Sequence, residues 1–154
     1  MHGVALRAKL ELVNVMAVSE QTSSLPREEQ VVLLVEDEPS LREMVSEFLQ
    51  FEGYRVVEAR DGTQAVQILN EHRPPPESLC MVLLDMMMPR LDGMDVLHHL
   101  SSLGEYVPVV AMSANRELLA EAAAAGAKAT LPKPFDLDRL ARVVARNCTP
   151  QSQE

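Results

Sequence analysis

The stretch VVLLVEDEPS, residues 31–40, decides the fold class of this chain. It begins with five consecutive apolar residues, 31–35, and three carboxylates follow at once, Glu36-Asp37-Glu38. A short uninterrupted apolar run of this kind is typical of a strand that is covered on both faces. The acidic triplet then stands where the strand ends, and open parallel α/β sheets bind their ligands at that edge. We therefore expect a parallel sheet with a functional site at one end.

A helix is predicted directly after the acidic triplet. Ser40, with Glu43 three residues later, has the spacing of a capping box. The apolar residues that follow fall on one helical face, and they are Leu41, Met44, Val45, Phe48 and Leu49. Gly53 is placed to end this helix, because glycine adopts the left-handed conformation that helix ends require.

The same alternation of apolar runs and amphipathic segments continues along the chain. Further strands are predicted at 54–59, 81–85, 107–112 and 127–131. Further helices are predicted at 63–71, from Asp92-Gly93 to about 103, at 116–125, and from Asp136 to about 147. Asn115 and Asp136 are placed to cap the last two helices, and the prolines at 74–76 prevent the helix at 63–71 from continuing. Alternating strands and helices predict an α/β fold, a (βα)5 three-layer sandwich with a parallel sheet.

Composition limits the domain count and the material of the core. The chain has 154 residues, enough for one domain of about 100–150 residues and a tail. We predict an N-terminal extension or linker at 1–29, a domain at 30–148 and a C-terminal tail at 149–154. Hydrophobic residues make up 47% of the chain but aromatic residues only 3%, so aliphatic side chains, Ala and Met must fill the core.

Charge and cysteine usage exclude several classes of function. The formal net charge of −9 disfavours nucleic-acid binding, which needs a basic surface. No apolar run approaches the roughly 18 residues of a membrane span, and residues 1–30 lack the features of a signal peptide. Cys80 and Cys148 match no zinc or CxxC spacing. We expect a cytoplasmic protein without a membrane partner, in which both cysteines are reduced structural thiols.

Polar groups follow four of the five predicted strands. They are Glu36 and Asp37, Asp85, Ser113 and Lys133. Carboxylates suit Mg²⁺, a carboxylate can act as a nucleophile toward a phosphoryl group, and an ammonium between two prolines is held in place to neutralise charge. Each residue taken alone also has an ordinary explanation, as an acidic turn, a helix cap or an exposed lysine. Together they predict a site for a divalent metal and a phosphoryl group.

The chain closely resembles the receiver domain of two-component response regulators, the CheY-like family. The matching stretches are VVLLVEDEPS at 31–40, MVLLDMMMPRLDG at 81–93, VPVVAMSA at 107–114 and AGAKATLPKPF at 125–135. Four motifs in order make the resemblance specific, and it covers about residues 30–147. It implies a flavodoxin-like fold with strand order 2-1-3-4-5. The last strand then lies at an edge, where Pro132 is tolerated because an edge strand can spare an N–H.

The resemblance implies a metal site and a phosphorylation site that share residues. Asp85 resembles the phosphoacceptor of the family and also a metal ligand. Asp37 is similar to the direct Mg²⁺ ligand, and Glu36 to the acid that acts through water. The backbone carbonyl of Met87 is the further metal ligand that the resemblance implies.

The remaining implied roles concern the phosphoryl group and the switch. Ser113 is similar to the switch hydroxyl, and Lys133 to the lysine that pairs with the phosphoryl group. The resemblance also implies a cis peptide bond between Lys133 and Pro134. Thr130 departs from the family pattern, which often has Tyr or Phe three residues before the lysine, so the resemblance does not extend to the aromatic part of the usual switch.

The resemblance implies a signalling domain and not an enzyme in the usual sense. A sensor histidine kinase or a histidine phosphotransfer protein would supply the phosphoryl group, and the domain would act as a monomer or weak dimer with no output domain in this chain. Three alternatives are open. An aspartyl-phosphate phosphohydrolase of the haloacid-dehalogenase type needs a second Asp where Met87 stands. A flavin-binding protein would place its phosphate against Glu36-Asp37-Glu38, which repels it. The third alternative is a receiver-like scaffold that is never phosphorylated.

Overall fold

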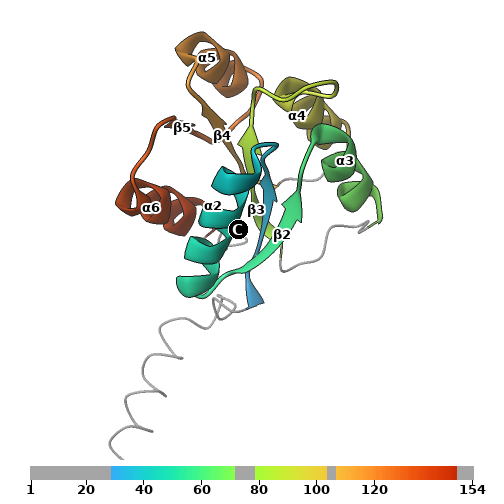
Figure 1. Cartoon of the computed structure of the whole chain (residues 1–154). Helices are drawn as coiled ribbons and strands as arrows, with labels where there is room; N and C mark the ends of the chain where they lie inside the picture. Colours follow the sequence, from blue (N-terminus) through green and yellow to red (C-terminus); the bar gives the residue numbers. More distant parts are fainter. Residues whose placement is uncertain (1–28, 72–78, 104–106, 149–154) are drawn as a thin grey trace, which may run out of the picture. The chain divides into compact units, whose positions relative to one another are not determined.

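The computed structural model describes residues 29–71, 79–103 and 107–148, and Figure 1 shows strands and helices alternating along them. The strands are β1 (Val31–Val35), β2 (Arg55–Ala59), β3 (Leu79–Asp85), β4 (Val109–Ser113) and β5 (Ala129–Pro132). The helices are α2 (Pro39–Phe51), α3 (Gly62–Glu71), α4 (Gly93–Ser102), α5 (Arg116–Ala124) and α6 (Leu137–Asn147). The predicted tail, nearly all of the predicted N-terminal extension and the prolines at 74–76 lie outside the described residues.

The five strands form one parallel sheet in the order β2-β1-β3-β4-β5, which confirms the predicted fold class and topology. All five residues of β1 are buried, as the continuous apolar run predicts. The register places Asp85 beside Met112 and Ser113 beside Pro132. The carboxyl ends of β3, β4 and β5 therefore meet at one edge of the sheet, where their polar residues stand.

Two hydrophobic layers enclose the sheet, one on each face, and Figure 1 shows the helices around the sheet. The first layer lies under α3, α4 and α5. Its buried strand residues include Leu33, Val82, Leu84 and Ala111. The layer under α2 and α6 is built from the intervening positions, including Val32, Leu34, Leu83 and Met112. Alternation across the central strands thus places helices on both faces, as a parallel sheet requires.

The first helix begins earlier than the sequence predicts, because its N-cap is Glu38 and not Ser40. Helix α2 starts at Pro39, and the residue before it, Glu38, makes no side-chain capping bond. Ser40 is therefore inside the helix, and the predicted capping box of Ser40 with Glu43 is wrong. The reason is that proline fits the first helical position, where its fixed φ is favourable and an N–H is not needed.

The predicted caps of the last two helices are confirmed. The Asn115 side chain accepts hydrogen bonds from the backbone N–H groups of Glu117 and Leu118, and the Asp136 side chain accepts one from Arg139. Asp92 and Asp95 form a capping box at the start of α4. These bonds satisfy the N–H groups that a helix leaves unpaired in its first turn.

Strand β4 begins at Val109 and not at residue 107, because Pro108 has no N–H to donate to a ladder. Strand β3 begins two residues earlier than predicted, at Leu79, so Cys80 belongs to the strand. In the described residues, no helix is long and apolar enough to cross a membrane.

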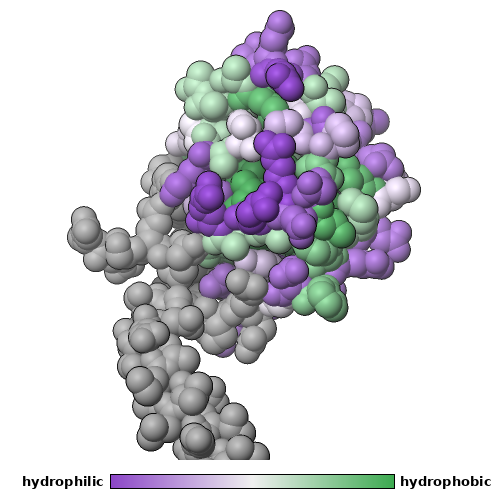
Figure 2. Space-filling view, turned by 90° about the vertical axis from the view of Figure 1, so that its left-hand side faces the viewer, coloured by the Kyte–Doolittle hydropathy of each residue, from purple (hydrophilic) through white to green (hydrophobic). Residues whose placement is uncertain are grey.

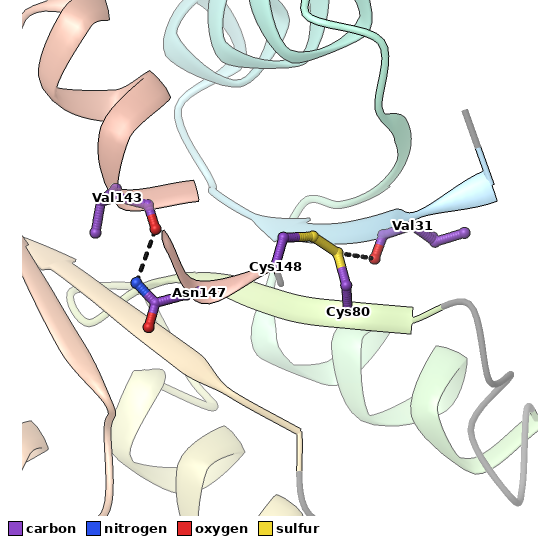
Figure 3. The surroundings of a disulfide bond; sticks show 5 residues. All are labelled: Val31, Cys80, Val143, Asn147 and Cys148. Atoms are coloured by element: carbon purple, nitrogen blue, oxygen red, sulfur yellow. Dashed lines mark hydrogen bonds between the residues drawn. A yellow bond between two sulfur atoms is a disulfide. The ribbon is translucent and has the colours of Figure 1, made fainter. Parts of the chain in front are cut away.

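Cys80 and Cys148 form a disulfide (Figure 3), so the prediction of two reduced thiols is wrong. The earlier start of β3 places Cys80 opposite the end of α6, which Cys148 follows. Their Cα atoms are 4.8 Å apart, within the usual range for a disulfide. The two residues are 68 positions apart in the chain, and only the fold brings them together.

Candidate functional site

The sheet brings four of the predicted side chains to one place. Glu36 and Asp37 follow β1, Asp85 is the last residue of β3, and Lys133 follows β5. The peptide bond between Lys133 and Pro134 is cis, as the resemblance implies. The site therefore forms because three parallel strands end at the same edge.

The acid cluster of Glu36, Asp37 and Asp85 has the geometry of a cation site. One carboxylate oxygen of each residue lies within 4.8 Å of the others. Glu36 and Asp85 are buried, with exposed fractions of 1% and 3%, while the Asp37 side chain is the exposed member. Oxygen donors, two held in the protein and one open to water, suit Mg²⁺, which retains several waters when it binds. The donor set present therefore fits the ion that the resemblance implies.

Within the described residues, the positive charge that pairs with this acid cluster is the ammonium group of Lys133. Its Nζ lies 2.7 Å from Oε1 of Glu36 and 3.5 Å from Oδ1 of Asp85. Burial alone would lower the pKa of Lys133, but the hydrogen bond to Glu36 and the charges of both acids raise it above 10.5. Lys133 is thus a fixed positive charge, and its closer partner is Glu36.

The Asp85 carboxyl is difficult to ionise in this environment. Burial, together with a hydrogen bond to Glu36 and the charge of Glu36, raises the pKa of Asp85 from 3.8 to about 7. The backbone N–H of Met87 and the charge of Lys133 act in the opposite direction. A cation added beside Asp85 would favour its charged form, so metal binding and ionisation of Asp85 are coupled.

Backbone and side-chain hydrogen bonds hold Glu36 in position. Its N–H donates to the carbonyl of Ala59 at 3.0 Å. Its Oε2 accepts from the N–H of Glu38 at 3.3 Å, and its own carbonyl accepts from the Arg42 guanidinium at 2.9 Å. Arg42 also forms an ion pair with Glu58 of β2 at 3.6 Å. Sequence reasoning missed Arg42, because a single arginine in a helical turn gives no sign that it contacts the preceding loop.

Ser113 and Met87 form hydrogen bonds with residues at the edge of the site. The Ser113 hydroxyl, which is buried, accepts a hydrogen bond from the N–H of Asn115 at 2.9 Å, and the Ser113 carbonyl accepts one from the N–H of Lys133 at 2.9 Å. The Met87 N–H donates to Oδ1 of Asp85 at 3.1 Å, and its side chain is 57% exposed. These hydrogen bonds do not test the predicted switch role of the Ser113 hydroxyl. They also do not test whether the Met87 carbonyl binds a metal, so both roles stay proposals.

Gly93 supports the loop that carries Asp85, and sequence reasoning placed it only at the start of a helix. A Cβ at Gly93 would lie 2.5 Å from the Cα of Met86 and 2.8 Å from the carbonyl oxygen of Asp85. These separations are shorter than van der Waals contact, so only glycine allows α4 to begin so close to the end of β3. The Asp92-Gly93 pair in the sequence was the available signal.

Thr130 lines a hollow between β5 and α6 that contains none of the acid cluster. The hollow is lined by Ala129, Thr130, Leu131, Arg139, Arg142, Val143, Arg146 and Asn147. Figure 2 views the molecule from the α6 side and shows hydrophilic residues over much of this face, with hydrophobic areas between them. The position that is often aromatic in the resembled family therefore borders an open, arginine-lined hollow in this protein.

The sequence of the chain matches that of a known family. The model of the response regulator receiver domain matches residues 32–145, which is most of the chain. This chain therefore belongs to the response regulator receiver domain family, and its place is in two-component signalling.

The curated relatives that the chain matches are response regulators. The chain is 39% identical over 125 residues to the response regulator MprA of Mycolicibacterium vanbaalenii, a match that covers 77% of this chain and 52% of that protein. It is 40% identical over 112 residues to MprA of Mycobacterium sp. strain KMS, covering 71% of this chain and 46% of that protein. The chain therefore spans about half the length of the curated relatives it matches.

Solved structures show the same fold. The chemotaxis protein CheY4 of Vibrio cholerae superposes with a TM-score of 0.66 at 30% identity, covering 77% of this chain and 98% of that one. The receiver domain of NtrX from Brucella abortus gives a TM-score of 0.68 at 31% identity, covering 76% and 97%. Both comparisons therefore support the same overall fold for this chain.

Proposed function

We propose that this chain is a phosphorylation-controlled receiver in which Asp85 accepts a phosphoryl group from a phosphohistidine. The observation that carries the proposal is the position of the Asp85 carboxylate, buried at the end of β3 between two further acids and the Lys133 ammonium. The donor is a sensor histidine kinase or a histidine phosphotransfer protein. Membership of the receiver domain family and similarity to response regulators support a donor of this kind.

The chemistry needs an ionised Asp85. Its oxygen attacks the phosphorus in line, an O–P bond forms, the N–P bond of the phosphohistidine breaks, and the imidazole leaves with the electron pair. Mg²⁺ would be held by Asp37 and Asp85 directly, by Glu36 through water and by the Met87 carbonyl. When bound, it supplies positive charge for the phosphoryl oxygens and for the carboxylate.

Lys133 and Glu36 prepare this site before the donor arrives. The 2.7 Å bond to Glu36 keeps the Lys133 ammonium at the edge of the cluster, and the 3.5 Å separation from Asp85 leaves it within reach of a phosphoryl oxygen. After transfer, the ammonium pairs with the new negative charge on Asp85. A short movement of one side chain thus replaces one ion pair with another.

The response to phosphorylation passes through Ser113. Its hydroxyl leaves the N–H of Asn115 and donates to a phosphoryl oxygen, which alters the start of α5 and the adjacent β5 and α6. Phosphorylation then biases a two-state element through a local change of charge. Thr130 is smaller than the aromatic residue often found there, so the change at β5 reaches the hollow beside α6 without an aromatic rotamer.

Phosphorylation changes the protein–protein interactions of the chain and does not control catalysis on a separate substrate. The protein acts in the cytoplasm as a monomer or weak dimer. Its direct contact with nucleic acid is disfavoured by the net charge of −9.

Mg²⁺-dependent labelling with radioactive acetyl phosphate tests the proposal. We expect acid-stable, base-labile label on the wild-type protein, none on Asp85→Asn, and normal labelling of Asp138→Asn, a control that removes an exposed carboxylate in the first turn of α6. Label that persists in Asp85→Asn would place the acceptor elsewhere. The absence of label from all three proteins, with intact folding by circular dichroism, would favour the scaffold that is never phosphorylated.

A further inference from the structure

The disulfide lies at the opposite end of β3 from the candidate phosphorylation site. Cys80 is the second residue of β3 and Asp85 is the last. At about 3.3 Å for each residue, the strand between them is roughly 17 Å long. The cysteine pair and the acid cluster are therefore separate sites, although each includes a residue of β3.

We propose that Cys80 and Cys148 form a reversible redox site, which clamps the end of α6 to the start of β3 when oxidised and releases it when reduced. Cys148 directly follows α6, and its N–H donates to the carbonyl of Val144 at 2.8 Å. The disulfide thus fixes the last turn of α6 to a central strand (Figure 3). The clamp therefore holds the helix that lines the hollow beside β5.

The reduced state is also accommodated by the surrounding structure. The Cys80 sulfur lies 3.3 Å from the carbonyl oxygen of Val31 (Figure 3), the position in which a thiol donates a hydrogen bond. Both cysteines belong to the hydrophobic layer under α2 and α6, and Leu140 and Val144 anchor α6 there without the disulfide. Because this core is extensive, the fold does not need a staple of the kind that small secreted domains require.

The two sulfur atoms differ in access, which sets the order of reaction. Cys148 is 2% exposed, whereas Cys80 is half-buried. The Cys80 thiolate therefore attacks first, on a low-molecular-weight disulfide, whose S–S bond breaks and releases one thiol. The Cys148 thiolate then attacks the Cys80 sulfur of the mixed disulfide and displaces the second thiol. Two protein thiols are oxidised and one small disulfide is reduced to two thiols.

The clamp has a consequence that rests on the proposed function. Phosphorylation of Asp85 is proposed to alter β5 and α6, and an oxidised clamp fixes α6 at its far end. Oxidation should therefore reduce the change in α6 that phosphorylation produces, without removing the acceptor or the metal ligands. The protein would then combine a redox signal and a phosphoryl signal on the same helix.

Redox titration of the full chain tests the site itself. The protein is equilibrated in buffers of reduced and oxidised glutathione. Thiol exchange is then stopped by alkylation, and the mass of the protein is measured by mass spectrometry. We expect a monomeric internal disulfide that forms and disappears without denaturant, a glutathione adduct on Cys80 in Cys148→Ser, and little adduct in Cys80→Ser. A pair that stays reduced in oxidised glutathione, or stays oxidised in reduced glutathione, overturns the proposal. Cys80→Ala and Cys148→Ala replace either serine variant that fails to fold.

Hydrogen exchange of the wild-type chain tests the clamp. We expect the amides at 143–147 to exchange at least about tenfold more slowly in the oxidised protein, with little change in α3 as an internal control. Equal exchange in the two states would overturn the clamp. These measurements use no phosphoryl donor, so they stand even if Asp85 is never phosphorylated. Repeating them with acetyl phosphate and Mg²⁺ tests the coupling, which fails if α6 responds equally in both redox states.

Discussion

Replacing Asp85 with asparagine should stabilise the metal-free protein at neutral and higher pH. Asp85 is buried and its pKa is raised from 3.8 to about 7, so the folded protein binds this proton more tightly than the unfolded chain. The contribution of Asp85 to stability is therefore full below the unfolded pKa and is lost as the pH rises through about 7. Asparagine keeps the shape of the side chain but does not ionise.

The magnitude follows from the size of the pKa change. At about 1.4 kcal/mol for each pH unit, a rise from 3.8 to about 7 corresponds to a ceiling of roughly 4 kcal/mol. The lost attraction to Lys133 reduces the net gain, and we expect Asp85→Asn to be about 1–3 kcal/mol more stable than the wild type at pH 8. Between pH 5.5 and pH 8 this advantage should grow by about 2 kcal/mol.

Urea unfolding across this pH range, in EDTA and under fixed redox conditions, measures the effect. Asp138→Asn is the matched control, because it removes one exposed carboxylate and should show no pH-dependent advantage. Mg²⁺ should stabilise the wild type at pH 8 and should stabilise Asp85→Asn much less. An advantage that does not vary with pH, or a variant less stable than the wild type at pH 8, would refute the reasoning about burial of Asp85.

Three further predictions concern the neighbours of the site. Gly93→Ala places a Cβ 2.8 Å from the carbonyl oxygen of Asp85, so unfolding by urea should show a loss of about 1–3 kcal/mol together with slower labelling; unchanged stability would mean that the loop yields freely. Lys133→Met leaves the buried Glu36 carboxylate without its 2.7 Å partner, which should cost about 2–4 kcal/mol, and adding Glu36→Gln should recover much of it; additive losses would contradict the pairing. Met87→Asn places a polar group where it can orient water, so the phosphorylated protein should decay faster in Mg²⁺ than the wild type, and equal lifetimes would contradict the proposed role of the apolar side chain.

The fold was predictable because the apolar runs and the strand-end polar residues follow the rules of parallel sheets. The run at 31–35 and the position of Asp85 after another such run are local patterns, and the topology that the resemblance implies brings them together. The last two helix caps were equally local. Pro39 occupies the first helical position, which suits its fixed φ, so Ser40 lies inside the helix and does not cap it.

Other features depend on contacts between distant residues and leave no local pattern. The pairing of Lys133 with Glu36 in preference to Asp85 is decided by distances of 2.7 Å and 3.5 Å, which no motif encodes. Arg42 reaches back to the Glu36 carbonyl from the next helix. The disulfide joins residues 68 positions apart, so the cysteine spacing alone could not predict it.

The short outer strand β5 has a consequence for how the protein behaves at high concentration. It contains four residues, ends at Pro132 and pairs only with β4 within the sheet. An outer strand exposes unpaired backbone groups, and a neighbouring molecule can extend the sheet through them. A four-residue strand offers few such groups, and its final proline offers no N–H. The edge nearest Lys133 is thereby protected against strand-to-strand aggregation while its loop remains free to respond to ligands.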